Sequence, residues 1–412
     1  MTEARSAVEA VFRIESARII AATARIVRDV GIAEEIAQDA LLAALEQWPE
    51  SGVPDRPGAW LMVTAKRRAI DLVRRKETYA RKLAEVGRTL EDVPPPEPAD
   101  PDRIDDDLLR LIFTSCHPVL STQARIALTL RLLGGLGTEE IARAFLATET
   151  TVAQRVVRAK RTLGRAGVPF EVPYGPDRAA RLDSVLEVIY LIFNEGYAAT
   201  TGDDLLRPAL CQDALRLARV LAGLMEKEPE VHGLVALLEL QASRAAARTG
   251  PDGAPVLLAD QNRSRWDRLL IRRGFAALAR ANEAGGAGPY ALQAAIAACH
   301  AHAVTYEATD WTVIATLYRR LAALVPSPVV ELNRAVAVSM AEGPAAGLVL
   351  VDALAAGPEL KAYHLLPSVR GDLLERLGRA QEARAEFVRA AELTRNEQER
   401  TLLLARADRV SR

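Results

Sequence analysis

The sequence has few cysteines and no long apolar run. Its three cysteines, Cys116, Cys211 and Cys299, lie far apart in 412 residues. This excludes a disulfide framework and a zinc module of the Cys-x-x-Cys kind, and it suits a reducing compartment. No window approaches the roughly 20 apolar residues of a membrane span, and the N-terminus has no apolar signal core. We therefore expect a cytoplasmic protein that has no membrane partner.

Motifs for catalysis and cofactor binding are also lacking. The sequence contains no Walker loop and no GxGxxG, GxSxG or HExxH pattern. The run Cys299-His300-Ala301-His302 contains potential metal ligands, but no third cluster accompanies it. We predict a protein that is not an enzyme and that needs no cofactor and no metal.

An excess of charge of one sign is missing as well. The chain has 53 Lys and Arg against 54 Asp and Glu, so any contact with DNA must come from local patches. Aromatic residues make up only 5%, whereas Ala, Leu and Arg dominate. This composition predicts an all-α fold, and the length predicts about two to four domains.

Residues 138–163 predict two short helices joined by a tight turn at 146–149. Thr138 is expected to cap the first helix, and the second helix is expected from about Thr150, with Val152, Val156 and Leu163 facing inward. The polar and basic residues expected on its outer face are Thr150, Thr151, Gln154, Arg155, Arg158, Lys160 and Arg161. This pattern indicates a helix-turn-helix that contacts base edges and phosphates. The alternative is a helical hairpin with a solvated basic face.

A second basic helix is predicted at 59–83, after a loop rich in proline and glycine at 49–58. Its expected apolar positions are Trp60, Leu61, Val63, Ile70 and Val73. Its cations are Lys66, Arg67, Arg68, Arg74, Arg75, Lys76, Arg81 and Lys82, against two acids. Such a run favours an anionic partner. Trp48 and Trp60 flank the loop, either to hold DNA bases out of the stack or to pack in the core.

The helix expected at 33–48 has a polar N-terminal half. Its residues Glu34, Glu35, Gln38 and Asp39 either compensate the helix dipole or form a docking face for a basic partner helix. Residues 84–105 are acidic and rich in proline, and they predict an extended, disordered linker. The expected domains are therefore 1–83, the linker 84–105, 106–166, and a helical part at 170–412.

The long C-terminal part predicts a series of helical hairpins. Residues 363–393 partly fit a tetratricopeptide repeat, whose packing positions would be Gly371, Leu374, Gly378, Ala383, Phe387 and Ala390. The segment Phe193–Thr200 places Asn194, Glu195 and Tyr197 at a helix end. It is read either as a structural turn or as a ligand or interdomain contact.

Taken in order over about residues 5–165, these features resemble an extracytoplasmic-function (ECF) sigma factor of bacterial RNA polymerase. Residues 33–45 resemble the polymerase-docking helix of region 2, residues 59–76 the helix that opens and reads the −10 element, and residues 138–163 region 4, which reads the −35 element. The resemblance implies core polymerase and promoter DNA as partners. The family often has Gly where Leu146 stands, and Lys-Ser where Ala153 and Gln154 stand.

The resemblance also implies roles for individual residues. Glu34, Glu35, Gln38 and Asp39 would pair with the polymerase clamp helices, and the loop before Trp60 would take a flipped base. The basic residues that follow would hold phosphates. Thr151, Gln154, Arg155 and Arg158 would enter the major groove.

The C-terminal part resembles the extension of a subgroup that bears a tetratricopeptide-like domain in place of a separate anti-sigma partner. We expect it to regulate the sigma half by packing on it or by recruiting a regulatory protein. The alternatives are a helix-turn-helix regulator that acts without polymerase, and a scaffold role for the C-terminal part.

Overall fold

The structure, a computed structural model, describes residues 2–86, 104–145, 147–197, 207–250, 255–394 and 396–410. In these ranges the regular structure is helical, and only isolated bridges such as Thr249 with Pro255 have β geometry. The predicted all-α class is therefore confirmed. The chain divides into two compact units, Met1–Leu191 and Ile192–Arg412.

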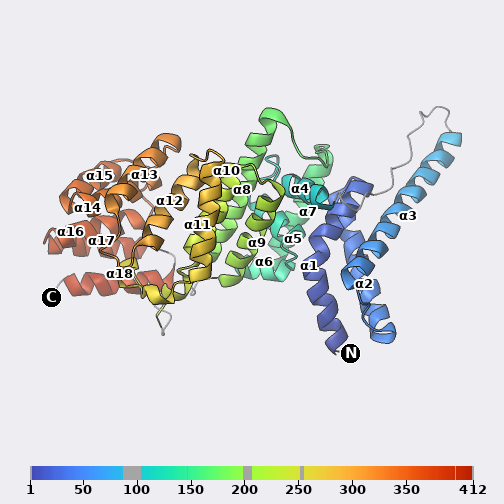
Figure 1. Cartoon of the computed structure of the whole chain (residues 1–412), viewed down its shortest axis with the longest axis horizontal. Helices are drawn as coiled ribbons and strands as arrows, with labels where there is room; N and C mark the ends of the chain where they lie inside the picture. Colours follow the sequence, from blue (N-terminus) through green and yellow to red (C-terminus); the bar gives the residue numbers. More distant parts are fainter. Residues whose placement is uncertain are drawn as a thin grey trace. The chain divides into compact units, whose positions relative to one another are not determined.

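The first unit contains seven complete helices and most of an eighth in its described part (Figure 1). They are α1 (Thr2–Val27), α2 (Val30–Ser51), α3 (Pro57–Val86), α4 (Ile104–Ser115), α5 (Thr122–Leu132), α6 (Thr138–Ala144), α7 (Glu149–Arg165) and α8 (Gly175–Tyr197). Helices α3 and α4 reach into both ends of the expected linker, whose residues 87–103 lie outside the described ranges.

Helices α1, α2 and α3 share one core, in which Ile19, Ile20, Ala37, Trp48 and Leu61 are buried. Helix α2 begins at a cap, because the Asp29 carboxylate accepts hydrogen bonds from the backbone of Gly31 and Ile32. It runs past Pro49, so the loop expected from residue 49 begins only at Gly52, which has a positive φ of 82°.

Two expected apolar positions of α3 face the solvent. Val63 is 49% exposed and Ile70 is 38% exposed, while Leu61, Ala65 and Ala69 form the buried stripe. The small alanines let α3 approach its neighbours closely, and this shifts the contact face away from the larger residues. The apolar positions named from the sequence therefore do not all lie on the contact face of α3.

Helices α6 and α7 form the predicted helix-turn-helix. Helix α7 starts at Glu149, and the Thr148 hydroxyl caps it by accepting from the Thr151 backbone at 3.2 Å. Val152, Val156 and Leu163 are buried as predicted. The turn residue Leu146 lies outside the described ranges.

The cap of α6 differs from the prediction. Thr138 is the first residue of the helix, and the carboxylate of Glu140 accepts from the Gly137 backbone at 2.6 Å. A glutamate in the first turn therefore satisfies the backbone donor that precedes the helix, as in half of a capping box.

Helix α8 extends the first unit beyond the boundary expected near residue 170. The Ser184 hydroxyl donates to the Cys116 carbonyl at 2.6 Å, and the Arg181 guanidinium donates to the Phe113 carbonyl at 3.0 Å. Arg125 of α5 pairs with Glu187 at 3.0 Å. These bonds hold the first part of α8 against the ends of α4 and α5, so the first unit ends at Leu191.

The second unit is a series of consecutive helix pairs in its described part. The helices are α9 (Pro208–Leu224), α10 (Pro229–Ala242), α11 (Arg268–Glu283), α12 (Pro289–His302), α13 (Trp311–Leu324), α14 (Pro328–Ala341), α15 (Pro344–Ala356), α16 (Leu365–Arg376), α17 (Ala380–Leu393) and α18 (Glu397–Val410). Five of them begin with proline, which fits the first helical position because its missing N–H would have no partner inside the helix.

The pair α16 and α17 has the packing that its repeat-like sequence predicts. A Cβ at Gly371 would lie 2.8 Å from the Phe387 ring, so the glycine lets the two helices approach. Ala383, Phe387 and Ala390 are fully buried, and Gly378 forms the turn with a φ of 75°.

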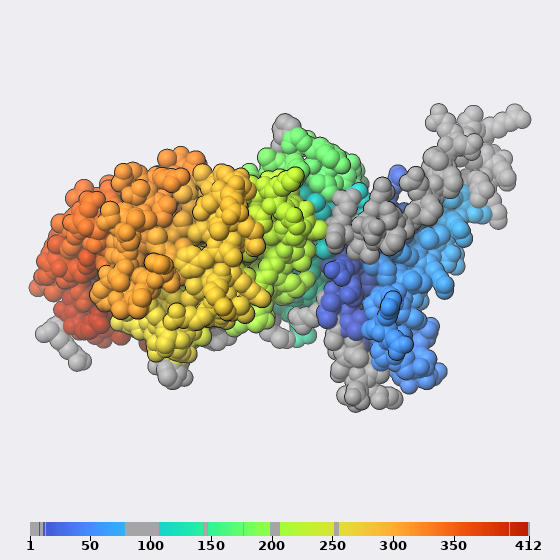
Figure 2. Space-filling view, in the orientation of Figure 1, coloured from blue at the N-terminus to red at the C-terminus, as the bar shows by residue number. Residues whose placement is uncertain are grey.

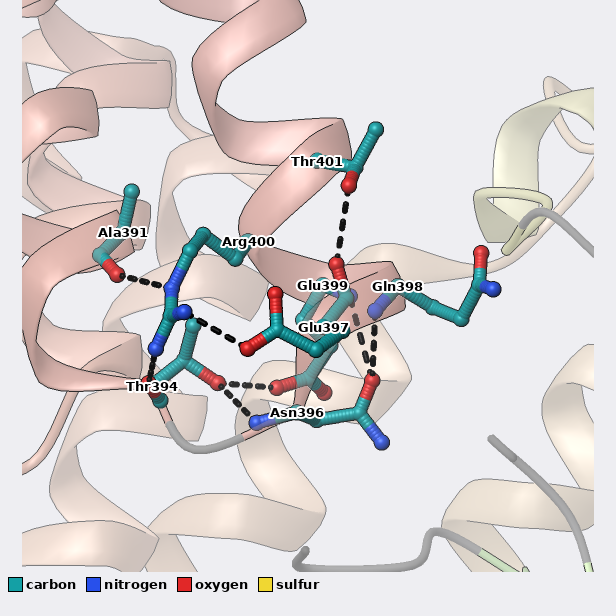
Figure 3. Close-up of polar contacts among 8 residues, drawn as sticks. All are labelled: Ala391, Thr394, Asn396, Glu397, Gln398, Glu399, Arg400 and Thr401. Carbon is teal, nitrogen blue, oxygen red and sulfur yellow. Dashed lines mark hydrogen bonds and ion pairs between the residues drawn. The ribbon is translucent and has the colours of Figure 1, made fainter. Parts of the chain in front are cut away.

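The start of α18 is fixed by polar contacts with the end of α17 (Figure 3). The Asn396 side chain accepts from the backbone of Gln398 at 3.0 Å and of Glu399 at 3.2 Å. The Thr394 hydroxyl donates to the Glu399 carboxylate at 2.8 Å, and Arg400 donates to the Thr394 carbonyl at 3.0 Å. This cap fixes where α18, the last helix of the described series, begins.

Candidate functional site

The first candidate surface is the basic face of α3. Its buried stripe of Leu61, Ala65 and Ala69 directs the opposite side outward. The exposed cations are Arg67, Arg68, Arg74, Arg75 and Lys76, and Lys66 is half-buried. The Arg68 guanidinium lies 3.3 Å from the Asp39 carboxylate of α2, both exposed. Most of this face therefore projects positive charge into solvent, and such a face attracts phosphates.

The two tryptophans beside the loop before α3 pack on each other. Their ring centroids are 5.5 Å apart with an edge-to-face angle of 71°. Trp48 is 2% exposed, which fits the core-packing interpretation, and Trp60 is half-buried over it. A base stacking on Trp60 stays a prediction.

The second candidate surface is the outer face of α7. Thr150, Gln154, Arg158 and Arg161 are exposed. Two further candidates are partly covered and held by neighbours. Thr151 shares a hydrogen bond with the Thr148 hydroxyl at 2.8 Å, and Arg155 donates to the Gln123 side chain at 3.4 Å. The recognition face of a helix-turn-helix has this composition, with amide and guanidinium groups next to hydroxyls.

Lys160 and Glu34 do not lie where the sequence suggested. Glu34 is 5% exposed, and its carboxylate receives the Arg131 Nε at 2.6 Å and forms an ion pair with Lys160. The Gln38 side chain donates to the same carboxylate at 3.0 Å. Glu34 is thus not on an exposed docking face, and Lys160 points toward α2 instead of outward. We name these three ionic residues, Glu34, Arg131 and Lys160, the junction triad.

A second buried carboxylate links the same two groups of helices. Asp107 of α4 is 2% exposed, and Arg25 of α1 lies 3.1 Å from it. Arg110, on the same helix, donates to it at 2.8 Å. A charged side chain is tolerated away from water when an opposite charge pairs with it and hydrogen bonds satisfy its polar atoms. Helices α1 and α2 are therefore joined to α4, α5 and α7 by two sets of ionic contacts.

The remaining candidates of α2 keep an outward face. Glu35 and Asp39 are exposed, and Gln38 is half-buried. Leu42, which the sequence analysis did not single out, is 55% exposed and follows Glu35 and Asp39 at helical spacing. The exposed stripe for a partner is therefore Glu35, Asp39 and Leu42.

The metal motif of the sequence does not assemble a site. Within the described ranges there is no group of three or more His, Cys, Asp and Glu placed to hold a metal ion. His300 is buried against the Trp311 ring, with centroids 5.2 Å apart. Burial, together with nearby Arg244 and Arg263, lowers the pKa of His300 to about 4.

The segment around Tyr197 makes contacts of a structural kind inside the second unit. Arg207 pairs with Glu195 and its backbone donates to the Gly196 carbonyl at 2.7 Å. The Arg248 guanidinium lies 3.9 Å from the centre of the Tyr197 ring. These contacts favour the structural-turn interpretation, although residues 198–200 of the motif lie outside the described ranges.

Comparison with known proteins identifies three segments. The model for sigma-70 region 2 matches residues 12–79, the model for sigma-70 region 4 matches residues 110–163, and a family of unknown function (DUF6596) matches residues 181–282. No solved structure matches the chain. The two sigma models cover the helices that carry the two basic faces.

Individual relatives match either the whole chain or its N-terminal part. An uncharacterized protein of Rhizobium meliloti (strain 1021) is 45% identical over 94% of this chain and 92% of its own length. The ECF RNA polymerase sigma factor SigK of Mycobacterium sp. (strain KMS) is 30% identical over 34% of this chain and 72% of its own length. The probable ECF RNA polymerase sigma factor SigI of Mycobacterium tuberculosis (strain ATCC 25618 / H37Rv) is 25% identical over 44% of this chain and 67% of its own length.

The fold and these matches define a sigma-70-type protein with region 2, region 4 and a long helical extension. The chain belongs to the ECF RNA polymerase sigma factor family. In the part of the chain that the structure describes, no helix is both long enough and apolar enough to cross a bilayer.

Proposed function

We propose that this chain binds core RNA polymerase in the cytoplasm and directs it to promoters with a −10 and a −35 element. The observation that carries the proposal is a pair of basic helices that pack on different neighbours, α3 on α1 and α2, and α7 on α5 and α6. The face of α3 would hold the −10 region through Lys66, Arg67, Arg68, Arg74, Arg75 and Lys76, and Trp60 would support an unstacked base. Thr150, Thr151, Gln154, Arg155, Arg158 and Arg161 of α7 would contact the −35 element.

Two of the expected contacts change in this proposal. Lys160 can reach DNA, and Glu34 can reach polymerase, only after the junction triad separates. Glu35, Asp39 and the exposed Leu42 are the polymerase contacts that need no such rearrangement, with Gln38 at their edge. An acidic and apolar stripe of this kind suits a basic partner helix.

The test is transcription in vitro with purified core polymerase and the full-length chain, on promoters mapped from the transcripts that the chain starts in cells. We expect RNA from defined start sites, and we expect loss of those starts when Arg74 and Arg75 are both changed to Glu. Failure of the full-length chain to bind core polymerase would instead favour a regulator that acts without polymerase. Unchanged starts from the Arg74→Glu/Arg75→Glu variant would contradict the role of α3.

The extension, in this proposal, regulates the sigma half. Its support is a large helical unit that region 2 and region 4 do not require. A truncation after Leu191 tests this better than one near residue 170, because the first part of α8 packs on α4 and α5. Equal transcription by the full-length and the truncated chain would reject the regulatory role.

A further inference from the structure

The second unit contains a polar groove that the sigma function does not use. Helix α10 forms its floor, and α9 and α11, which both pack on α10, form its walls; their surfaces are yellow-green to yellow in Figure 2. The groove has a volume of about 1060 Å³. This volume is at the upper end of those of ligand sites.

Two buried polar side chains stand in the floor of the groove. Helix α10 is buried along its length, yet His232 and Glu239 interrupt its apolar residues. The Glu239 side chain is 2% exposed, and Arg219 donates to its Oε1 at 2.8 Å. Its Oε2 has no hydrogen-bond partner among the residues that the structure describes. A buried carboxylate oxygen of this kind calls for a hydrogen-bond donor.

His232 adds a second acceptor. Its Nε2 lies 2.7 Å from the Glu226 carbonyl, which can only accept, so Nε2 carries the proton. In the neutral ring Nδ1 is then an acceptor, and it too has no partner in the described part of the chain. His232 and Glu239 are seven residues apart on one helix face, which is about 10 Å along the axis.

Cations and carboxylates both line the sides of the groove: Glu226 and Glu283 lie there with Lys227, Arg273 and Arg280. Lys227, Arg273 and Arg280 are exposed at the groove and form no ion pair within the described ranges. Arg273 and Arg280 repeat the spacing of the floor, again about 10 Å along α11. The groove therefore offers acceptors below and, at the side, separated cations outside the described ion pairs, interspersed with the carboxylates of Glu226 and Glu283.

We propose that this groove binds an acidic peptide of a partner protein in an extended, polyproline-II-like conformation. In that conformation backbone N–H groups have no internal partner, so they can donate to the buried acceptors of Glu239 and His232 once side-chain movement exposes these atoms to the groove. Residues three apart share a face and are about 9 Å apart, which places two carboxylates at the spacing of Arg273 and Arg280. A single small anion would need clustered cations, whereas here the cations are spread along the groove.

The experiment measures fluorescence anisotropy of labelled synthetic peptides with the full-length chain, without polymerase or DNA. The peptide ESAESAE has acids three residues apart, EEESSAA has the same composition with clustered acids, and QSAQSAQ is uncharged. We expect ESAESAE to bind about tenfold more tightly than EEESSAA, and QSAQSAQ not to bind. Millimolar glucose 6-phosphate should not displace ESAESAE.

Variants assign the binding to the groove. Arg273→Glu with Arg280→Glu should weaken binding of ESAESAE by about tenfold or more, because two attractions become repulsions. Arg272→Glu is the matched control, since Arg272 is an exposed neighbour on α11 that does not line the groove. Glu239→Gln should also weaken binding, with circular dichroism as the check on folding.

Three results would overturn the proposal. They are no binding of ESAESAE, equal losses in the Arg272 control and the Arg273/Arg280 variant, or displacement by glucose 6-phosphate at lower concentration than by unlabelled peptide. The last result would assign the groove to a small phosphorylated molecule instead. Because the assay contains no polymerase or promoter, its failure leaves the proposed sigma function unaffected.

Discussion

A covalent lock on the junction triad would test whether the first unit must open to use both basic helices. A Cβ built at Gly31 would lie 3.9 Å from the Cβ of Lys160, which is within the range of a disulfide. Changing Gly31 and Lys160 to cysteine should therefore join the start of α2 to α7. Among the native cysteines Cys116 is buried, so its thiol is shielded from exchange with the new pair.

The size of the effect follows from distances and loop length. Elements named −10 and −35 are centred roughly 25 base pairs, or about 85 Å, apart on B-DNA, whereas α7 with 17 residues is about 25 Å long. We expect a lock that holds the start of α2 against α7 to keep the two basic faces from spanning that separation. The disulfide closes a loop of more than a hundred residues with a covalent bond, so the oxidised form cannot separate residue 31 from residue 160, and transcription that needs this separation should fall to background.

The assay compares promoter-specific transcription by the oxidised and the reduced double variant, with oxidation completed before core polymerase is added. We expect the oxidised form to start almost no RNA and the reduced form to recover. Each single cysteine variant is a control, because Lys160→Cys alone removes one ion of the triad. Full transcription by the oxidised double variant, with the disulfide verified by mass spectrometry, would refute the requirement for opening.

Other predictions address single features. Glu34→Gln should lower the free energy of unfolding of the first unit by about 2–3 kcal/mol in urea titrations. This is less than the loss on breaking a fully buried ion pair, because the partners of Glu34 are partly exposed. Glu35→Gln, at an exposed neighbour, should change the stability little. Reversing the charge of Arg158 should weaken binding of a −35 duplex by about 1–3 kcal/mol if the contact is to a base, which a gel-shift titration would detect. His300 has a pKa of about 4 in the folded protein, below its ordinary 6.5, so the unfolded state binds the proton more readily. The stability of the second unit should therefore fall as the pH drops from about 6.5 toward 4. His300→Gln should remove this pH dependence of the melting temperature. Gly371→Ala should destabilise the second unit by about 1–3 kcal/mol through overpacking, and no such loss in denaturant titrations would contradict the packing described for α16 and α17.

Helical periodicity was sufficient where one face of a helix meets its own neighbours. Val152, Val156 and Leu163 of α7 were predicted to face inward because their spacing follows a single helical stripe, and they are buried. The pair α16 and α17 was predictable for the same reason, since Gly371 and Phe387 combine a small residue with a large one. In both cases the information lies within a few turns of sequence.

The burial and pairing of charged residues could not be predicted where their partners are distant in the chain. Glu34 looked like an ordinary early-helix acid, but it lies on the stripe of Val30, Ala33 and Ala37, which faces the core. That stripe was a usable signal for burial. The sequence around Glu34 did not identify Arg131 and Lys160 as its partners, because both lie far from it in the chain. These cations are what makes burial of its carboxylate tolerable.

Backbone details followed tertiary context as well. Helix α2 passes Pro49 because Trp48, buried at 2% exposure, holds its last turn against the core, so proline did not mark the start of the loop. The buried alanines of α3 outweighed its larger apolar residues for the same reason. Propensity rules rank local conformations, and packing decides between those that are close in free energy.

The position of Glu34 also separates two kinds of acidic residue on one helix. Glu35 and Asp39 lie on the exposed side of α2, where charge can attract a partner at little desolvation cost. Glu34 is removed from water, and its carboxylate needs the cations of α5 and α7 as long as those helices stay in place. A partner that draws α7 away must therefore supply replacement charge or water to Glu34. If core polymerase does so with its own basic residues, docking and opening are energetically coupled. The Glu34→Gln variant should then open more easily than the Glu35→Gln variant, yet bind polymerase less tightly.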